Sequence, residues 1–118
     1  MLRIETSGLH VKIDDKLQRY VTKKIGGLEK YLTKPARTSA HAEVKLIAKK
    51  AKDKNECTCE VIMHLPIENI TVRETTINMF AAIDICEAKL KHGLRKYKDM
   101  HGSPRPHRRL INRLRRKE

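Results

Sequence analysis

Residues 78–100 read NMFAAIDICEAKLKHGLRKYKDM, and the apolar residues of this stretch recur at spacings of three and four. At 3.6 residues per turn, such spacings place side chains on one stripe of a helix. Asn78 is a suitable N-cap for that helix. The stretch therefore predicts an amphipathic helix that covers a sheet. Its apolar stripe consists of Met79, Ile83, Cys86, Leu90, Leu94 and Tyr97.

The opposite side of this helix is basic. Lys89, His92 and Lys96 project together, Arg95 lies at their edge, and we expect no carboxylate among them. A solvated face normally mixes both signs of charge. A basic face can also serve solubility alone, so this helix does not decide the function.

Residues 14–32 predict a second amphipathic helix, with Asp14 as its N-cap. Gly26-Gly27 interrupts it, and the alternatives there are a bend, a close backbone approach or a frayed second half. The apolar stripe consists of Leu17, Val21, Ile25, Leu28 and Leu32. The far side carries a second basic stripe of Lys16, Arg19, Lys23, Lys30 and Lys34.

The rest of the chain alternates between apolar and polar residues. A short first strand ends at Ser7-Gly8, Lys34-Pro35 ends the first helix, and residues 40–48, 57–65 and 70–73 predict three antiparallel strands. Residues 49–56 predict a long polar loop, and residues 66–69 a tight turn. The fold class is therefore α+β, a two-layer β-α-β-β-β-α sandwich with both helices on one face of a four-stranded sheet. The two basic stripes would then form one positive surface with a groove between the helices.

Charge is the outlying feature of the composition. The 118 residues carry a formal net charge of +13 and a pI near 10.0, which favours polyanions: nucleic acid first, then an anionic membrane, then an acidic protein. No apolar run approaches the ~18 residues of a membrane span, so we expect no membrane partner. With no signal-peptide pattern at the N-terminus, the expected location is cytoplasmic. The few aromatic residues favour contacts with phosphates and nucleic-acid shape over base reading.

The chain divides into one domain over residues 1–100 and a basic tail over residues 101–118. The tail holds six arginines and one lysine against one glutamate, with Gly102, Pro104 and Pro106 at its start. Such a composition predicts a disordered tail or a linker.

No residue pattern supports catalysis. The common nucleotide-binding, zinc-protease and nucleophile-elbow motifs are missing from the sequence, so we predict no enzyme, no catalytic residue, no cofactor and no small-molecule substrate. Cys57, Cys59 and Cys86 are expected to be buried reduced thiols, and His41 and His64 lie on the other face of the sheet. We also predict no metal site, because zinc-ribbon C-x-x-C pairs do not occur.

Two stretches carry a resemblance. LRIETSGLHVKIDDKLQRYVTKKIGGLEKYL and TVRETTINMFAAIDICEAKLKHGLRKYKD resemble the first strand and helix, and the last strand and helix, of the ribosome hibernation-promoting factor family, also called ribosome-associated translation inhibitors or ribosomal subunit interface proteins. In the second stretch, the aromatic residue followed by A-A-I-D, then K-L and a basic ending, is typical of that family. The resemblance covers about residues 1–100.

The resemblance implies a domain similar in shape to double-stranded-RNA-binding domains. Such a domain would bind the small ribosomal subunit and its rRNA in the mRNA and tRNA channel, and inhibit translation under stress or in stationary phase. Long family members add a ribosome-dimerising domain, which is missing here, so ribosome dimerisation is not assigned. The RNA-binding residues predicted from the basic stripes and this resemblance are Lys16, Arg19, Lys23, Lys30, Lys89, Lys91, His92, Arg95, Lys96 and Lys98.

Two other functions remain open at this stage. A stand-alone double-stranded-RNA-binding module would use the lysines of residues 49–56 to straddle grooves. An adaptor for an acidic protein partner would bind with a shallower salt dependence than phosphate neutralisation gives.

Overall fold

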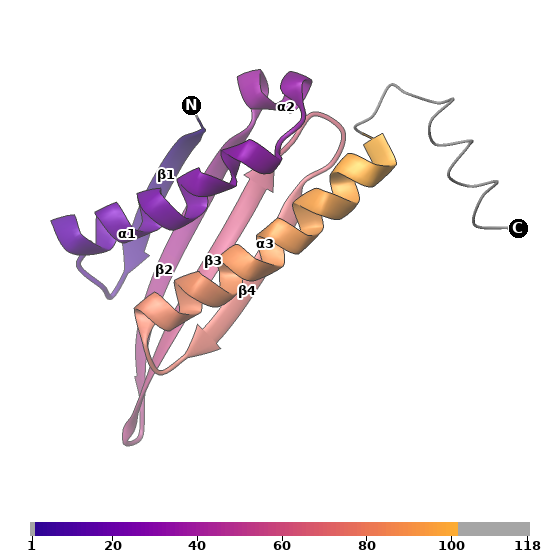
Figure 1. Ribbon diagram of the computed structural model, residues 1–118. Helices are drawn as coiled ribbons and strands as arrows, with labels where there is room; N and C mark the ends of the chain where they lie inside the picture. The colour runs from indigo at the N-terminus through magenta and orange to yellow at the C-terminus, as the bar shows by residue number, and fades with distance from the viewer. Residues whose placement is uncertain (1, 102–118) are drawn as a thin grey trace, which may run out of the picture.

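The structure is a computed structural model that describes residues 2–101 (Figure 1). Four strands and two helices follow the expected order, and two short helices that were not predicted are added. The elements are β1 (Arg3–Leu9), α1 (Asp15–Gly26), the 3-10 helix η1 (Gly27–Tyr31), α2 (Lys34–Ser39), β2 (His41–Ala51), β3 (Lys54–His64), β4 (Ile70–Thr76) and α3 (Met79–His101).

The four strands form one mixed sheet in the order β1-β2-β3-β4. β1 runs parallel to β2, which requires the crossover that α1 supplies, whereas β3 pairs antiparallel with both β2 and β4. Both long helices lie over the same face of this sheet (Figure 1). The α+β two-layer fold predicted from the sequence is confirmed.

The core lies between the helices and the sheet. The predicted stripes of α1 and α3 are buried against alternating residues of β2 and β3, such as Val44 and Leu46 on β2 and Val61 and Met63 on β3. Each fully buried aliphatic side chain contributes about 1.5–3 kcal/mol relative to an exposed one. The helix starts are capped as predicted, because Asp14 accepts from Leu17 N at 2.8 Å and Asn78 from Phe80 N at 2.8 Å.

The prediction of a long loop at residues 49–56 is wrong. β2 continues to Ala51 and β3 begins at Lys54, so only Lys52 and Asp53 turn the chain, with Lys52 at φ 56°. This hairpin projects beyond the helical layer (Figure 1). Because both faces of the hairpin tip meet water, its residues need no apolar alternation, and the sequence signal of a strand is lost there.

The segment after α1 also differs from the prediction. The α-helix ends at Gly26 and continues as η1, with Gly26 and Gly27 in ordinary right-handed conformation. A Cβ on Gly27 would meet nothing within 4 Å, so no close backbone approach explains this glycine. Lys34-Pro35 does not lead directly into a strand but starts the short helix α2. Thr33 caps it, and a proline near a helix start is favourable because its missing N–H would have no partner there.

α3 extends one residue beyond the expected end of the domain at residue 100. His101 still belongs to α3, and its Nε2 lies 3.4 Å from Glu68 Oε1. The rest of the predicted tail, residues 102–118, lies outside the described residues.

Candidate nucleic-acid interface

The helical layer is built from α1 and α3, which lie side by side. Lys16 Nζ lies 5.7 Å from the centre of the Phe80 ring, Tyr20 meets Phe80 edge to face at 4.9 Å, and Lys24 contacts Asp84. Rising residue numbers on α1 therefore meet rising numbers on α3, so the two helices run in the same direction. Both helices lie side by side in one layer over the sheet (Figure 1).

The middle of the seam between the helices is not purely basic. Tyr20 donates a hydrogen bond to Asp84 at 2.5 Å, and Lys24 Nζ lies 3.5 Å from Asp84 and 3.9 Å from Glu87. The pKa of Tyr20 is raised to about 12, mainly by the hydrogen bond to the Asp84 carboxylate and secondarily by burial. Two carboxylates thus lie between the predicted basic stripes, and Lys24 balances part of their charge.

The basic residues converge at the far end of the seam. Lys30, Lys91 and Arg95 surround the ring of Tyr31 at 5.4, 5.3 and 5.6 Å from its centre; we call these four residues the Tyr31 cluster. A ring face attracts cations through its quadrupole, so Tyr31 holds three positive groups close together. A hydrogen bond with Lys91 is the main reason that the pKa of Tyr31 is lowered. Among residues 2–101, the ion pairs of the long helices involve Lys24, Lys89 and His101, and none involves a cation of this cluster.

Lys89 lies on the other flank of α3. Its Nζ is 2.8 Å from Glu74 Oε1 on β4, so the expectation that no carboxylate neutralises this basic face is wrong for Lys89. His92 borders the same flank, where it lines a shallow depression with Ile85, Ala88 and Lys89. The ten predicted residues therefore do not form one patch. The structure brings Lys30, Lys91 and Arg95 together, whereas Lys89 pairs with Glu74 on the other flank of α3.

The other predicted residues lie outside the Tyr31 cluster. Arg19, Lys23, Lys96 and Lys98 are exposed, and Lys16 lies at the opposite end of the seam beside Phe80. Their role in binding RNA stays a prediction.

Two residues of this surface were missed by the sequence analysis. Lys24 follows Lys16 and Tyr20 at helical spacing on one flank of α1, which is a signal that the sequence contains. Tyr31 is not among the predicted residues, yet its ring is only partly buried and lies among cations. Its cluster joins η1 to α3, about 60 residues further along the chain, so only the fold reveals it.

The cysteines have the expected role. All three are free; Cys59 and Cys86 are buried in the core, where the Cys86 thiol donates to the Cys59 carbonyl oxygen at 3.2 Å. The neighbouring Cys86 and burial both raise the pKa of Cys59, which keeps that thiol protonated. Cys57 is half-buried on β3, where it pairs with Ala48 of β2 and Thr76 of β4.

Fold and surface together define a class of protein. This is a small α+β domain whose helical layer gathers cations around an aromatic ring, and such a surface suits a polyanionic partner. Within residues 2–101, no helix has both the length and the apolar character needed to cross a membrane.

Comparison with known proteins identifies the family of the chain. Residues 4–101 match the model of the family described as sigma 54 modulation protein / S30EA ribosomal protein. The chain belongs to this family, which confirms the resemblance noted in the sequence.

Two relatives carry the name ribosome hibernation promotion factor. The protein of Lactococcus lactis subsp. cremoris (strain MG1363) is 34% identical over 108 residues, which cover 89% of this chain and 55% of that protein. The protein of Staphylococcus aureus (strain COL) is 35% identical over 100 residues, covering 83% of this chain and 49% of that protein. The chain thus spans about half the length of these curated relatives.

Solved structures share the fold. The N-terminal domain of Thermus thermophilus protein Y superposes with a TM-score of 0.70 at 24% identity, covering 82% of this chain and 99% of that domain. A ribosomal subunit interface protein from Coxiella burnetii gives a TM-score of 0.66 at 22% identity, covering 83% of this chain and 99% of its own.

Proposed function

We propose that this chain is a ribosome hibernation factor that binds the small ribosomal subunit in the mRNA and tRNA channel and inhibits translation under stress or in stationary phase. Membership of the family and the names of the relatives support the ribosome as partner. Inhibition would follow from occupancy of the channel and needs no catalytic group.

The observation that carries the proposal is the Tyr31 cluster. Lys30, Lys91 and Arg95 present three cations within one small area on the helical layer. Rigidly placed cations bind phosphates by releasing condensed counterions, and Arg adds directional hydrogen bonds. We expect rRNA phosphates to lie against this cluster, with Lys16, Arg19, Lys23, Lys96 and Lys98 as further contacts along the same layer.

A second candidate has one observation in its favour. The β2–β3 hairpin extends beyond the helices and carries Lys49, Lys50, Lys52 and Lys54. A projecting basic hairpin is a feature that a stand-alone double-stranded-RNA-binding module could use to reach across a groove.

Charge reversal at the two surfaces distinguishes these functions. Lys91→Glu with Arg95→Glu removes two cations of the Tyr31 cluster, and Lys50→Glu with Lys54→Glu makes the same change in net charge on the hairpin. Each charge-assisted contact is worth about 1.5–3 kcal/mol, so the first variant should lose at least ~100-fold in affinity for small subunits. The measurement is co-sedimentation with purified small subunits in competition with initiator tRNA, with helical content checked by circular dichroism.

The hairpin variant serves as the matched control. Near-normal, saturable and tRNA-sensitive binding by the hairpin variant, with loss in the cluster variant, supports the hibernation function. Loss in the hairpin variant alone, with equal affinity for free RNA duplex, would favour the second candidate. Reversal of Lys89 is a poorer test, because it would place two carboxylates together at Glu74.

A further inference from the structure

The face of the sheet that the helices leave uncovered carries a cluster of metal-ligating side chains. His41 and Glu43 lie on this face of β2, and His64 lies on the same face of β3, where His41 and His64 are direct partners in the strand register. One potential ligand atom from each of the three residues lies within 4.8 Å of the other two. We propose that His41, Glu43 and His64 form a binding site for a divalent transition-metal ion, with Zn²⁺ as the ion that suits the ligand set.

The distance between two of the ligands fits a shared ion. His64 Nε2 lies 3.2 Å from Glu43 Oε2. Zinc ligands lie at about 2.0–2.2 Å from the metal, so two ligands of one tetrahedral ion are about 3.3–3.5 Å apart. The two atoms are therefore already spaced as neighbours in a zinc coordination sphere.

The hydrogen bonding of His64 points to the same interpretation. Its Nε2 atom is buried and has no hydrogen-bond partner within the described part of the chain, although a carboxylate oxygen is close by. A buried polar atom without a partner is costly. A cation between Nε2 and the carboxylate would satisfy both lone pairs at once.

His41 completes the set. Its ring stacks on that of His64 with centres 4.3 Å apart and planes inclined by 13°. A ring nitrogen of His41 lies within 4.8 Å of the ligand atoms of Glu43 and His64, because His41 and His64 face each other across the strand pair. Three protein ligands leave a fourth position for water or another ligand.

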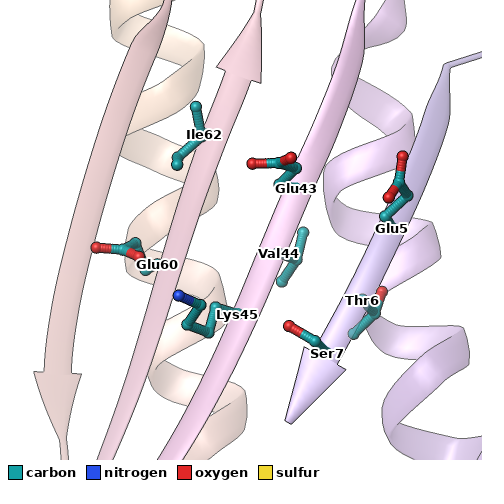
Figure 2. Close-up of a pocket in the computed structure, with 8 residues that line it drawn as sticks. All are labelled: Glu5, Thr6, Ser7, Glu43, Val44, Lys45, Glu60 and Ile62. Atoms are coloured by element: carbon teal, nitrogen blue, oxygen red, sulfur yellow. The ribbon is translucent and has the colours of Figure 1, made fainter.

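The surrounding charges contain both signs. Glu5 of β1 is the direct register partner of Glu43, and like charges in this position repel unless a cation lies near them. Figure 2 shows Glu5, Glu43 and Glu60 on three neighbouring strands along the groove of this face, with Lys45 beside Glu60. Arg3 is the register partner of His41 and opposes a cation there.

The ligand types select the class of metal. Two imidazoles and one carboxylate suit zinc and its first-row neighbours, whereas Ca²⁺ and Mg²⁺ prefer oxygen ligands throughout. No metal site was expected from the sequence, because it contains no closely spaced C-x-x-C pairs. The proposed site instead depends on the register of two strands, which places His64, 21 residues after Glu43, diagonally beside it.

The test uses the full chain after removal of metals with a chelator. Titration with Co²⁺ as the optical probe should saturate at one ion per chain. The visible absorption should be that of a four-coordinate site without a thiolate charge-transfer band, and Zn²⁺ should displace the Co²⁺. Zn²⁺ should also raise the midpoint of thermal unfolding.

Variants show where the ion binds. His64→Gln should abolish stoichiometric binding and the thermal shift, and Glu43→Gln, at an exposed side chain, should weaken binding at least tenfold. His10→Asn is the control: it also removes an imidazole, and asparagine tolerates the φ of 60° at that position. We expect this control to bind as the unaltered chain does.

Several outcomes would overturn the proposal. The first is that the unaltered chain does not bind the metal at a fixed stoichiometry. The second is a thiolate charge-transfer band, which would assign the ion to the cysteines. The third is that the single variants Glu43→Gln and His64→Gln both bind the metal as well as the unaltered chain does. If His64→Gln fails to fold, Glu43→Gln alone decides. Because no ribosome is involved, these results are independent of the proposed function.

Discussion

At the scale of single residues, two lysines of α3 show why helical spacing is an incomplete guide to a surface. Lys89 and Lys91 are two positions apart, and both were predicted to bind RNA. Lys89 turns toward β4 and pairs with Glu74, whereas Lys91 turns toward η1 and joins the Tyr31 cluster. The partner on the neighbouring element, and not the residue type, decides which charge is available.

Two glycines give a prediction at the same scale. A Cβ on Gly8 would lie 2.7 Å from the Val11 carbonyl oxygen, whereas a Cβ on Gly27 would meet nothing within 4 Å. We expect Gly8→Ala to lower the free energy of unfolding by about 1–3 kcal/mol, because the backbone must move to remove the overlap. The matched Gly27→Ala should raise it by about 0.4–1 kcal/mol, since the unfolded chain loses freedom at no steric cost. Denaturant unfolding of both variants measures these changes, and a stabilising Gly8→Ala would contradict the close approach.

At the scale of elements, the contact between Tyr20 and Asp84 joins α1 to α3. The carboxylate raises the pKa of Tyr20 to about 12, from an ordinary value near 10. A raised pKa in the folded state means that the protonated phenol is favoured there. Its contribution to stability is therefore complete below about pH 10 and is lost as the pH rises through about 12.

Titration of tyrosinate absorbance tests this contact. In the unaltered chain we expect one tyrosine to ionise near pH 12, and Tyr20→Phe to remove that transition. Asp84→Asn should move it down toward the ordinary value near 10, because the negative acceptor is gone. A transition that stays in place in Asp84→Asn would show that burial, and not the carboxylate, controls the tyrosine.

Most of the elements themselves could be predicted from the sequence. The apolar stripes of α1 and α3 and the strand alternation of β2 and β3 correspond to their burial. The prediction failed at α2 and at the hairpin tip. α2 has only six residues, too few for a helical period to show, and the hairpin tip has no buried face to impose alternation.

At the scale of the whole molecule, charge is distributed over two different surfaces. The helical layer carries the Tyr31 cluster, and the opposite face of the sheet carries His41, Glu43 and His64. The proposed polyanion and the proposed metal ion would thus bind on opposite sides of the sheet, and neither would obstruct the other.

The salt dependence of binding tests the polyanionic partner at this scale. A protein that neutralises phosphates loses affinity linearly on logarithmic scales, with about 0.7–0.9 in slope for each phosphate contact. Lys91→Glu with Arg95→Glu should therefore reduce the slope by roughly 1.4–1.8, whereas the hairpin variant should leave it unchanged. Equal slopes for the cluster variant and the unaltered chain would mean that these side chains do not contact phosphates, as in an adaptor for an acidic protein.

The α+β class, the order of the main elements and the basic character of both helices could be predicted from the sequence, because hydrophobic periodicity and charge are local properties of the chain. Tertiary structure alone decided which charges remain available and which side chains meet. Glu74 forms an ion pair with Lys89, and Asp84 and Glu87 place negative charge in the seam between the helices. Tyr31 contacts cations from two segments, and the strand register places His64 beside Glu43. These outcomes depend on distances between residues far apart in the chain, and no local pattern encodes such distances.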